Sequence, residues 1–124
     1  YGMRKPLVAL FSCDTRMICE LPAEGKGSFR FAVCEGIDEV EEFFDFNRAA
    51  AFIADFREAA FGQHEEAFWL GSMSRRFDDM KIVVVTSAEM PASLRRRENI
   101  AQIRCDDDRT PTTELLARLI ATAI

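Results

Sequence analysis

The chain has 124 residues, of which 48% are hydrophobic and 30% charged, and its formal net charge at pH 7 is −5. This length suits one domain with a substantial core, and the composition is that of a soluble globular protein rather than a disordered one. A protein that binds the phosphate backbone normally carries a basic surface, so the acidic balance argues against direct nucleic-acid binding.

No apolar stretch approaches the roughly 20 residues that a helix needs to cross a bilayer. The amino end also lacks a secretory signal pattern. We therefore expect a cytoplasmic protein with no membrane partner. Residues 1–124 are expected to form a single domain, with Met3 as the natural start and Tyr1 and Gly2 as an artificial addition.

The chain contains four cysteines and one histidine. The cysteines are Cys13, Cys19, Cys34 and Cys105, and no two of them form a CxxC pair. A structural zinc site needs about four such ligands at close spacing, so the pattern argues against one. We expect reduced thiols, and a surface position for His64.

Apolar runs alternate with amphipathic segments from the start of the chain. Leu7–Phe11 is a continuous apolar run, which is typical of a strand covered on both faces. Residues 14–21 predict a short helix that Pro22 and then Gly25-Lys26-Gly27 break. Residues 29–34 have a β-rich pattern, and residues 37–44 predict a helix with one apolar and one acidic face.

The middle of the chain continues this alternation. Residues 50–55 predict a third strand, and the β-branched run of residues 81–86 predicts a fourth. Between them, residues 65–76 predict a helix whose inward side chains are Phe68, Trp69, Met73 and Phe77. The eleven phenylalanines, including Phe44, Phe46 and Phe52, are expected mostly in the core, and a few near the third strand and its loop are expected to leave an apolar surface for a partner.

The last third predicts a short charged helix at residues 91–99 and a weaker strand at residues 100–105. Thr110 and Pro111 are a favourable N-cap and first helical residue for a terminal amphipathic helix. Strict alternation of five strands and five helices predicts a parallel sheet between helices. The single-domain form is a flavodoxin-like (βα)5 three-layer sandwich with strand order 2-1-3-4-5.

Acidic and hydroxyl side chains lie at the ends of three predicted strands: Asp14, Asp55 and Thr86. Strands one and three are neighbours in this strand order, so their carboxyl ends would bring the two carboxylates together. Nearby carboxylates repel unless a divalent cation lies between them, and magnesium prefers oxygen ligands. A carboxylate at such a site can attack a phosphoryl group, with Thr86 and Arg104 to contact it.

With this order of strand ends, the chain resembles the receiver domains of two-component response regulators, from Leu7 to Ile124. The resemblance matches Asp55, in Phe-Ile-Ala-Asp, to the phosphoacceptor. It matches Thr86, in Val-Val-Val-Thr, to the switch hydroxyl. It implies a weak magnesium site at Asp14, Asp55 and the backbone carbonyl of Arg57.

The same resemblance implies a signal-transduction module of a phosphorelay rather than an enzyme. Asp55 would accept a phosphoryl group from a histidine kinase or a phosphotransfer protein. The module would then signal through the face made by the fourth and fifth strands and helices, where homodimers can also form. Arg104 is the candidate counter-ion for the phosphoryl group.

The sequence departs from the receiver pattern at two strand ends. Ser12 and Cys13 stand where receivers carry a pair of acids, and Arg104 is not followed by the lysine and proline that usually close the fifth strand. A serine and a thiol are poor magnesium ligands. The alternative interpretation is therefore a pseudo-receiver that binds proteins without phosphorylation, with Asp55 as a structural carboxylate.

A more remote alternative is a cysteine phosphotransfer subunit, since sugar-phosphotransferase B subunits carry a nucleophilic cysteine after the first strand. Cys13 occupies that position here. However, Asp14 lies beside it and the segment has no glycine. The carboxylate disfavours a thiolate and repels phosphate.

Overall fold

The computed structural model describes residues 5–56, 63–86, 92–104 and 113–123. In these ranges, strands and helices alternate: β1 (Leu7–Phe11), α1 (Thr15–Gly25), β2 (Arg30–Cys34), α2 (Ile37–Phe46), β3 (Ala51–Asp55), α3 (Gln63–Arg76), β4 (Lys81–Thr86), α4 (Ala92–Arg95), β5 (Ile100–Arg104) and α5 (Thr113–Ala123). The sheet order is β2-β1-β3-β4-β5, and all four pairings are parallel. This confirms the predicted flavodoxin-like (βα)5 architecture.

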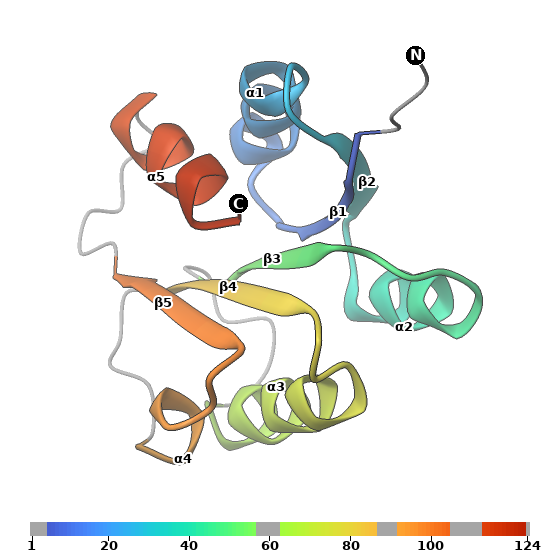
Figure 1. Cartoon of the computed structure of the whole chain (residues 1–124), viewed down its shortest axis with the longest axis vertical. Coiled ribbons are helices and arrows are strands. Elements are labelled where there is room, and N and C mark those ends of the chain that lie inside the picture. Colours follow the sequence, from blue (N-terminus) through green and yellow to red (C-terminus); the bar gives the residue numbers. More distant parts are fainter. Residues whose placement is uncertain (1–4, 57–62, 87–91, 105–112, 124) are drawn as a thin grey trace.

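Helices cover both faces of the sheet (Figure 1): α1 and α5 lie on one face, and α2, α3 and α4 lie on the other. Successive residues of a strand serve the two faces in turn. In β1, Val8 and Leu10 join the core that contains Met17 of α1 and Leu119 of α5. Phe11 joins the core on the opposite face. Double coverage explains why β1, β3 and β4 are continuous apolar runs.

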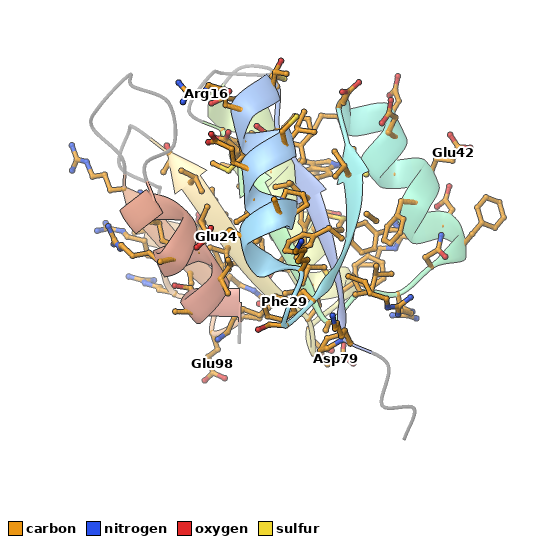
Figure 2. All side chains as sticks on the ribbon, turned by 90° about the horizontal axis from the view of Figure 1, so that it is seen from above. Arg16, Glu24, Phe29, Glu42, Asp79 and Glu98 are labelled. Atoms are coloured by element: carbon orange, nitrogen blue, oxygen red, sulfur yellow. The ribbon has the colours of Figure 1, made fainter. Side chains whose placement is uncertain are left out.

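Among the described residues, the charged side chains other than Asp55 are not buried in this sandwich. Those labelled in Figure 2 include Arg16 and Glu24 on α1 and Glu42 on α2, all of which are exposed. Within the described ranges, every helix is too short or too polar to span a bilayer.

Pro22 lies inside α1 and does not end it, so that prediction was wrong. Proline has no N–H to donate within the helix, which costs a hydrogen bond. The last turn nevertheless continues because it packs tightly on its neighbours. Leu21 is fully buried, and a Cβ added to Gly25 would lie 2.7 Å from the ring of Phe31.

Phe68 does not face the core as predicted, because its side chain is 74% exposed. The buried residues of α3 include Leu70 and Met73, and Phe77 just beyond its end is buried as well. Spacings of three and four residues place these side chains on one stripe, and Phe68 lies off it. Phe46 was likewise expected in the core but is 84% exposed at the end of α2.

Asn99, just before β5, connects this strand to the end of α3. Its Nδ2 group donates to the backbone carbonyls of Ser74, Phe77 and Met80 at 3.0–3.2 Å. Its Oδ1 accepts a hydrogen bond from the hydroxyl of Ser74, which is fully buried. Arg97 donates to the same hydroxyl at 2.8 Å. These bonds satisfy the Ser74 carbonyl in the last turn of α3, which the end of a helix leaves without a partner, and hold the turn that leads from α3 to β4. The predicted helix at residues 91–99 is accordingly shorter, since α4 ends at Arg95.

Candidate functional site

The candidate site lies at the carboxyl ends of the central strands. Asp55 is the last residue of β3 and is 4% exposed. β1 lies on one side of β3, with Phe11 opposite Ala54, and β4 lies on the other, with Val85 opposite Asp55. The chain leaves β1 for α1 on one face and β3 for α3 on the other (Figure 1). Asp55 therefore lies at the topological switch point of the sheet, as the sequence predicted.

Ser12, the residue after β1, contacts Asp55 directly. Its hydroxyl donates to Oδ2 of Asp55 at 2.7 Å, and Ser12 is fully buried. The Oγ of Ser12 in turn accepts a hydrogen bond from the backbone N–H of Asp14 at 3.0 Å. A buried carboxylate needs hydrogen-bond donors such as this hydroxyl. Burying it without donors costs several times the free energy that one hydrogen bond contributes to stability. The sequence analysis treated Ser12 only as a poor metal ligand and missed this role.

Asp14 has a second task at this edge of the sheet, because it is the N-cap of α1. Its Oδ1 accepts a hydrogen bond from the backbone N–H of Arg16 at 2.9 Å. A carboxylate at this position satisfies one of the free N–H groups of the first turn and is favoured by the helix dipole. Asp14 thus begins the helix that follows β1.

The predicted magnesium site at Asp14 and Asp55 stays a prediction, and the neighbouring residues at these strand ends add no good ligand to it. Ser12 directs its hydroxyl hydrogen at Asp55, and Cys13 offers a thiol, which magnesium disfavours. Across the described ranges, no group of three or more His, Cys, Asp or Glu side chains could hold a metal ion. Arg57, the predicted carbonyl ligand, lies outside the described residues.

Thr86 and Arg104 lie on the far side of Asp55 from Ser12. They end β4 and β5, and they are direct neighbours across these strands. Because Val85 is opposite Asp55, Thr86 lies one residue beyond it in the direction of the strand ends. Arg104 is exposed, and Thr86 is partly buried. The fold thus brings Asp55, Thr86 and Arg104 to one edge, and their roles there stay predictions.

Aromatic side chains lie beneath this edge on the α3 face. The ring of Phe56 lies 5.5 Å from that of Phe11 and 6.3 Å from that of Trp69, measured between centroids. The indole N–H of Trp69 donates to Glu41 at 3.1 Å, which links α3 to α2. The residue after Asp55 is therefore anchored in the core, and this anchoring limits the movement of the Asp55 backbone.

The cysteines of this edge differ in exposure. Cys13 is exposed, whereas Cys34, at the end of β2, is buried. Burial, with a smaller contribution from the nearby carboxylate of Glu39, raises the pKa of the Cys34 thiol. A raised pKa reduces the thiolate fraction, so Cys34 is an inert thiol near neutral pH.

No protein-family model matches the chain, and no curated protein matches it. Solved structures do. A response regulator from Thermotoga maritima has a TM-score of 0.66 at 13% identity, with 96% of this chain and 98% of that one covered. The N-terminal domain of the nisin resistance regulator NsrR has a TM-score of 0.67 at 16% identity, with 98% and 100% covered.

The receiver domain of an HD domain-containing protein from Pseudomonas fluorescens Pf-5 is similar as well. Its TM-score is 0.69 at 10% identity, with 96% of this chain and 91% of that one covered. These similarities and the strand order define the class of the fold, which is that of response-regulator receiver domains. At such low identity they extend to the fold alone.

Proposed function

We propose that the chain is a single-domain, receiver-like signal-transduction module that works through protein contacts and does not depend on phosphorylation of Asp55. One observation carries this proposal. The buried hydroxyl of Ser12 donates to Asp55 at 2.7 Å, at a strand end where receivers carry an acid. Asp55 therefore acts as a structural carboxylate that joins β1 to β3.

The chemistry of phosphoryl transfer supports this choice. An incoming phosphoryl group and a carboxylate are both negative, so the reaction needs a cation that offsets the repulsion. The described strand ends supply a hydroxyl and a thiol where the second and third carboxylates would stand. In addition, the Ser12 hydrogen bond stabilises the carboxylate charge and makes Oδ2 a weaker nucleophile.

The contact face of this module would be the edge made by β4, α4, β5 and α5. Three exposed arginines lie along it, one in each of α4, β5 and α5: Arg95, Arg104 and Arg118. Exposed guanidinium groups favour partners with acidic surfaces. A kinase, a phosphotransfer protein or a second copy of the chain would bind there. Direct binding to nucleic acid or membrane does not belong to the proposal.

A second candidate function keeps Asp55 as a phosphoacceptor. It is favoured by the position of Asp55 beside Thr86 and Arg104 at the strand ends. In this version, a carboxylate oxygen of Asp55 attacks the phosphorus of a partner's phosphohistidine. The phosphorus–nitrogen bond breaks, and the imidazole leaves with a proton. Thr86 would then donate to a phosphoryl oxygen, and Arg104 would offset its charge.

Intact-mass spectrometry separates the two candidates. The protein is incubated with acetyl phosphate and magnesium, beside Asp55→Asn and Cys13→Ser. We expect no adduct on the wild-type chain. A gain of about 80 Da, the mass of one phosphoryl group, that Asp55→Asn removes would reject the proposal and establish the phosphoacceptor. A gain that Cys13→Ser removes would instead establish the cysteine phosphotransfer alternative.

A further inference from the structure

A cavity at the amino ends of β3 and β4 takes no part in the receiver-like site. Its volume is about 290 Å³, and it lies between the end of α2, the residues that lead into β3, and the end of α3. Asp55 is at the other end of β3, seven residues after Arg48, and the strand between them spans about 13 Å. Two labelled residues mark the two ends in Figure 2: Arg16 lies at the start of α1, and Asp79 lies just before β4 at the opposite end.

Two guanidinium groups line the cavity and stack on one ring. The Cζ of Arg48 lies 5.1 Å from the centroid of Phe77, and the Cζ of Arg76 lies 4.8 Å from it. The two groups are therefore at most about 10 Å apart. Stacking on an aromatic face fixes a guanidinium group through its plane and leaves the N–H groups at its edge for a carboxylate.

The charges of the cavity do not cancel. Arg76 contacts Oδ1 of Asp45 at 3.4 Å, a long contact between half-exposed side chains. Within the described part of the chain, Arg48 forms no ion pair. Its guanidinium group lies over the ring of Phe77. The lining thus carries two cations and one anion, although the whole chain has a net charge of −5.

An exposed aromatic side chain adjoins these cations. Phe46 lines the cavity and is 84% exposed, the highest value among the large hydrophobic residues recorded as exposed. An exposed phenyl ring beside a pocket offers apolar area that a partner can bury. The combination of ring and guanidinium groups matches a peptide in which an apolar side chain neighbours a carboxylate.

We propose that this cavity docks an acidic peptide segment of a partner protein. A carboxylate of the segment accepts hydrogen bonds from Arg48 and Arg76, and an adjacent apolar side chain covers Phe46. This docking site goes beyond the proposed function, because it uses the opposite end of the sheet and none of its residues contacts Asp55. Its failure would leave the account of Asp55 unchanged.

The probe for this proposal is a blocked pentapeptide in which two glutamates flank a leucine, and its control carries glutamines instead. Titration is followed by ¹H–¹⁵N NMR of the uniformly labelled chain. We expect saturable shifts at the side-chain N–H groups of Arg48 and Arg76 and at the backbone amides of residues 45–48. The glutamine peptide should bind with an affinity at least about tenfold lower, because the charge-assisted hydrogen bonds are lost.

Single substitutions test whether the glutamate peptide binds at this cavity. Arg48→Gln should weaken binding of the glutamate peptide about tenfold. Arg75→Gln is the matched control, because it removes the same charge from the neighbouring, exposed residue of α3 that does not line the cavity, and it should change affinity by less than about twofold. Asp45→Asn removes the internal competitor for Arg76 and should tighten binding about twofold. Tighter binding cannot come from misfolding.

Four results would overturn the proposal. The glutamate peptide could bind no better than the glutamine peptide, or Arg75→Gln could weaken it as much as Arg48→Gln. Sodium phosphate alone could give the same shifts, which would make the cavity a site for free anions. Sedimentation could reveal a dimer that Arg48→Gln dissociates, which would assign the cavity to a second copy of the chain.

Discussion

The two ends of the sheet are held together in different ways. At the amino end, one side chain, Asn99, contacts three backbone carbonyls and the buried Ser74 hydroxyl, and it joins α3 to the start of β5. At the carboxyl end, the hydroxyl of Ser12 donates to the buried carboxylate of Asp55 and joins β1 to β3. The amino end is thus held by an amide and its carbonyl partners, whereas a hydrogen bond to a buried carboxylate contributes at the carboxyl end.

This difference gives the two ends of the sheet different sensitivities to substitution. A network of several bonds keeps part of its value when one partner shifts, because the others remain. A hydrogen bond to a buried carboxylate is sensitive to any change of charge beside it. A substitution at the carboxyl end should therefore change the surroundings of the Asp55 carboxylate while the amino end keeps the fold intact.

Replacing Ser12 with aspartate should have the largest effect. Ser12→Asp places a second carboxylate against buried Asp55, and the free energy of unfolding should fall by about 3–5 kcal/mol without a divalent cation. Magnesium should restore part of this loss, because the variant supplies the missing acid. Urea denaturation with and without magnesium measures both effects.

Ser12→Asn is the matched control for this change, since it adds similar volume without charge. It should cost about 1–2 kcal/mol and show no response to magnesium. Equal unfolding free energies for the aspartate and asparagine variants would mean that residues 12 and 55 are not in contact.

Removal of the amino-end network should have the next largest effect. Asn99→Ala removes the amide that contacts three carbonyls and the Ser74 hydroxyl, and the free energy of unfolding should fall by about 2–3 kcal/mol. Asn47→Ala is the control, because Asn47 is exposed and its amide donates only to the carbonyl of Phe43 among the recorded hydrogen bonds. Its cost should be below about 1 kcal/mol. A larger loss for Asn47→Ala than for Asn99→Ala would contradict the network.

A substitution beside the thiol of Cys34 should have the smallest effect of the three. Its raised pKa favours the protonated form in the folded chain, so its contribution to stability is present below the ordinary thiol value of 9.0 and is lost as the pH rises through the folded pKa. Glu39→Gln removes the smaller cause and should speed modification of Cys34 by a thiol reagent about twofold. Peptide mapping after timed labelling measures this rate, with exposed Cys19 as the internal reference. An unchanged ratio of the two rates would exclude a role for Glu39.

Much of the fold could be predicted from sequence because its signals are local. The β-branched run predicted the bounds of β4 correctly. The alternation of strands and helices predicted a parallel flavodoxin-like sheet with the observed strand order. Pro22 and Phe68 were predicted wrongly because tertiary packing decided them. The contact of Gly25 with Phe31 keeps α1 helical beyond its proline, and the Leu70–Met73–Phe77 stripe turns Phe68 outward.

The candidate site was predictable in its position and not in its contacts. The place of Asp55 follows from the strand order alone. The bond from Ser12 depends on a side-chain rotamer and on the register of β1 and β3, which no spacing along the chain encodes. The cavity at Arg48 and Phe77 has no sequence signature at all, because two segments far apart in the chain form it.

The most direct test of this account is a magnesium titration of the wild-type chain, followed by the backbone NMR signals of residues 12, 14 and 55. If the Ser12 hydroxyl, rather than a metal ion, holds the Asp55 carboxylate, these signals should not move at millimolar magnesium. Saturable shifts at all three residues would contradict the account and return Asp55 to the metal-dependent phosphoacceptors.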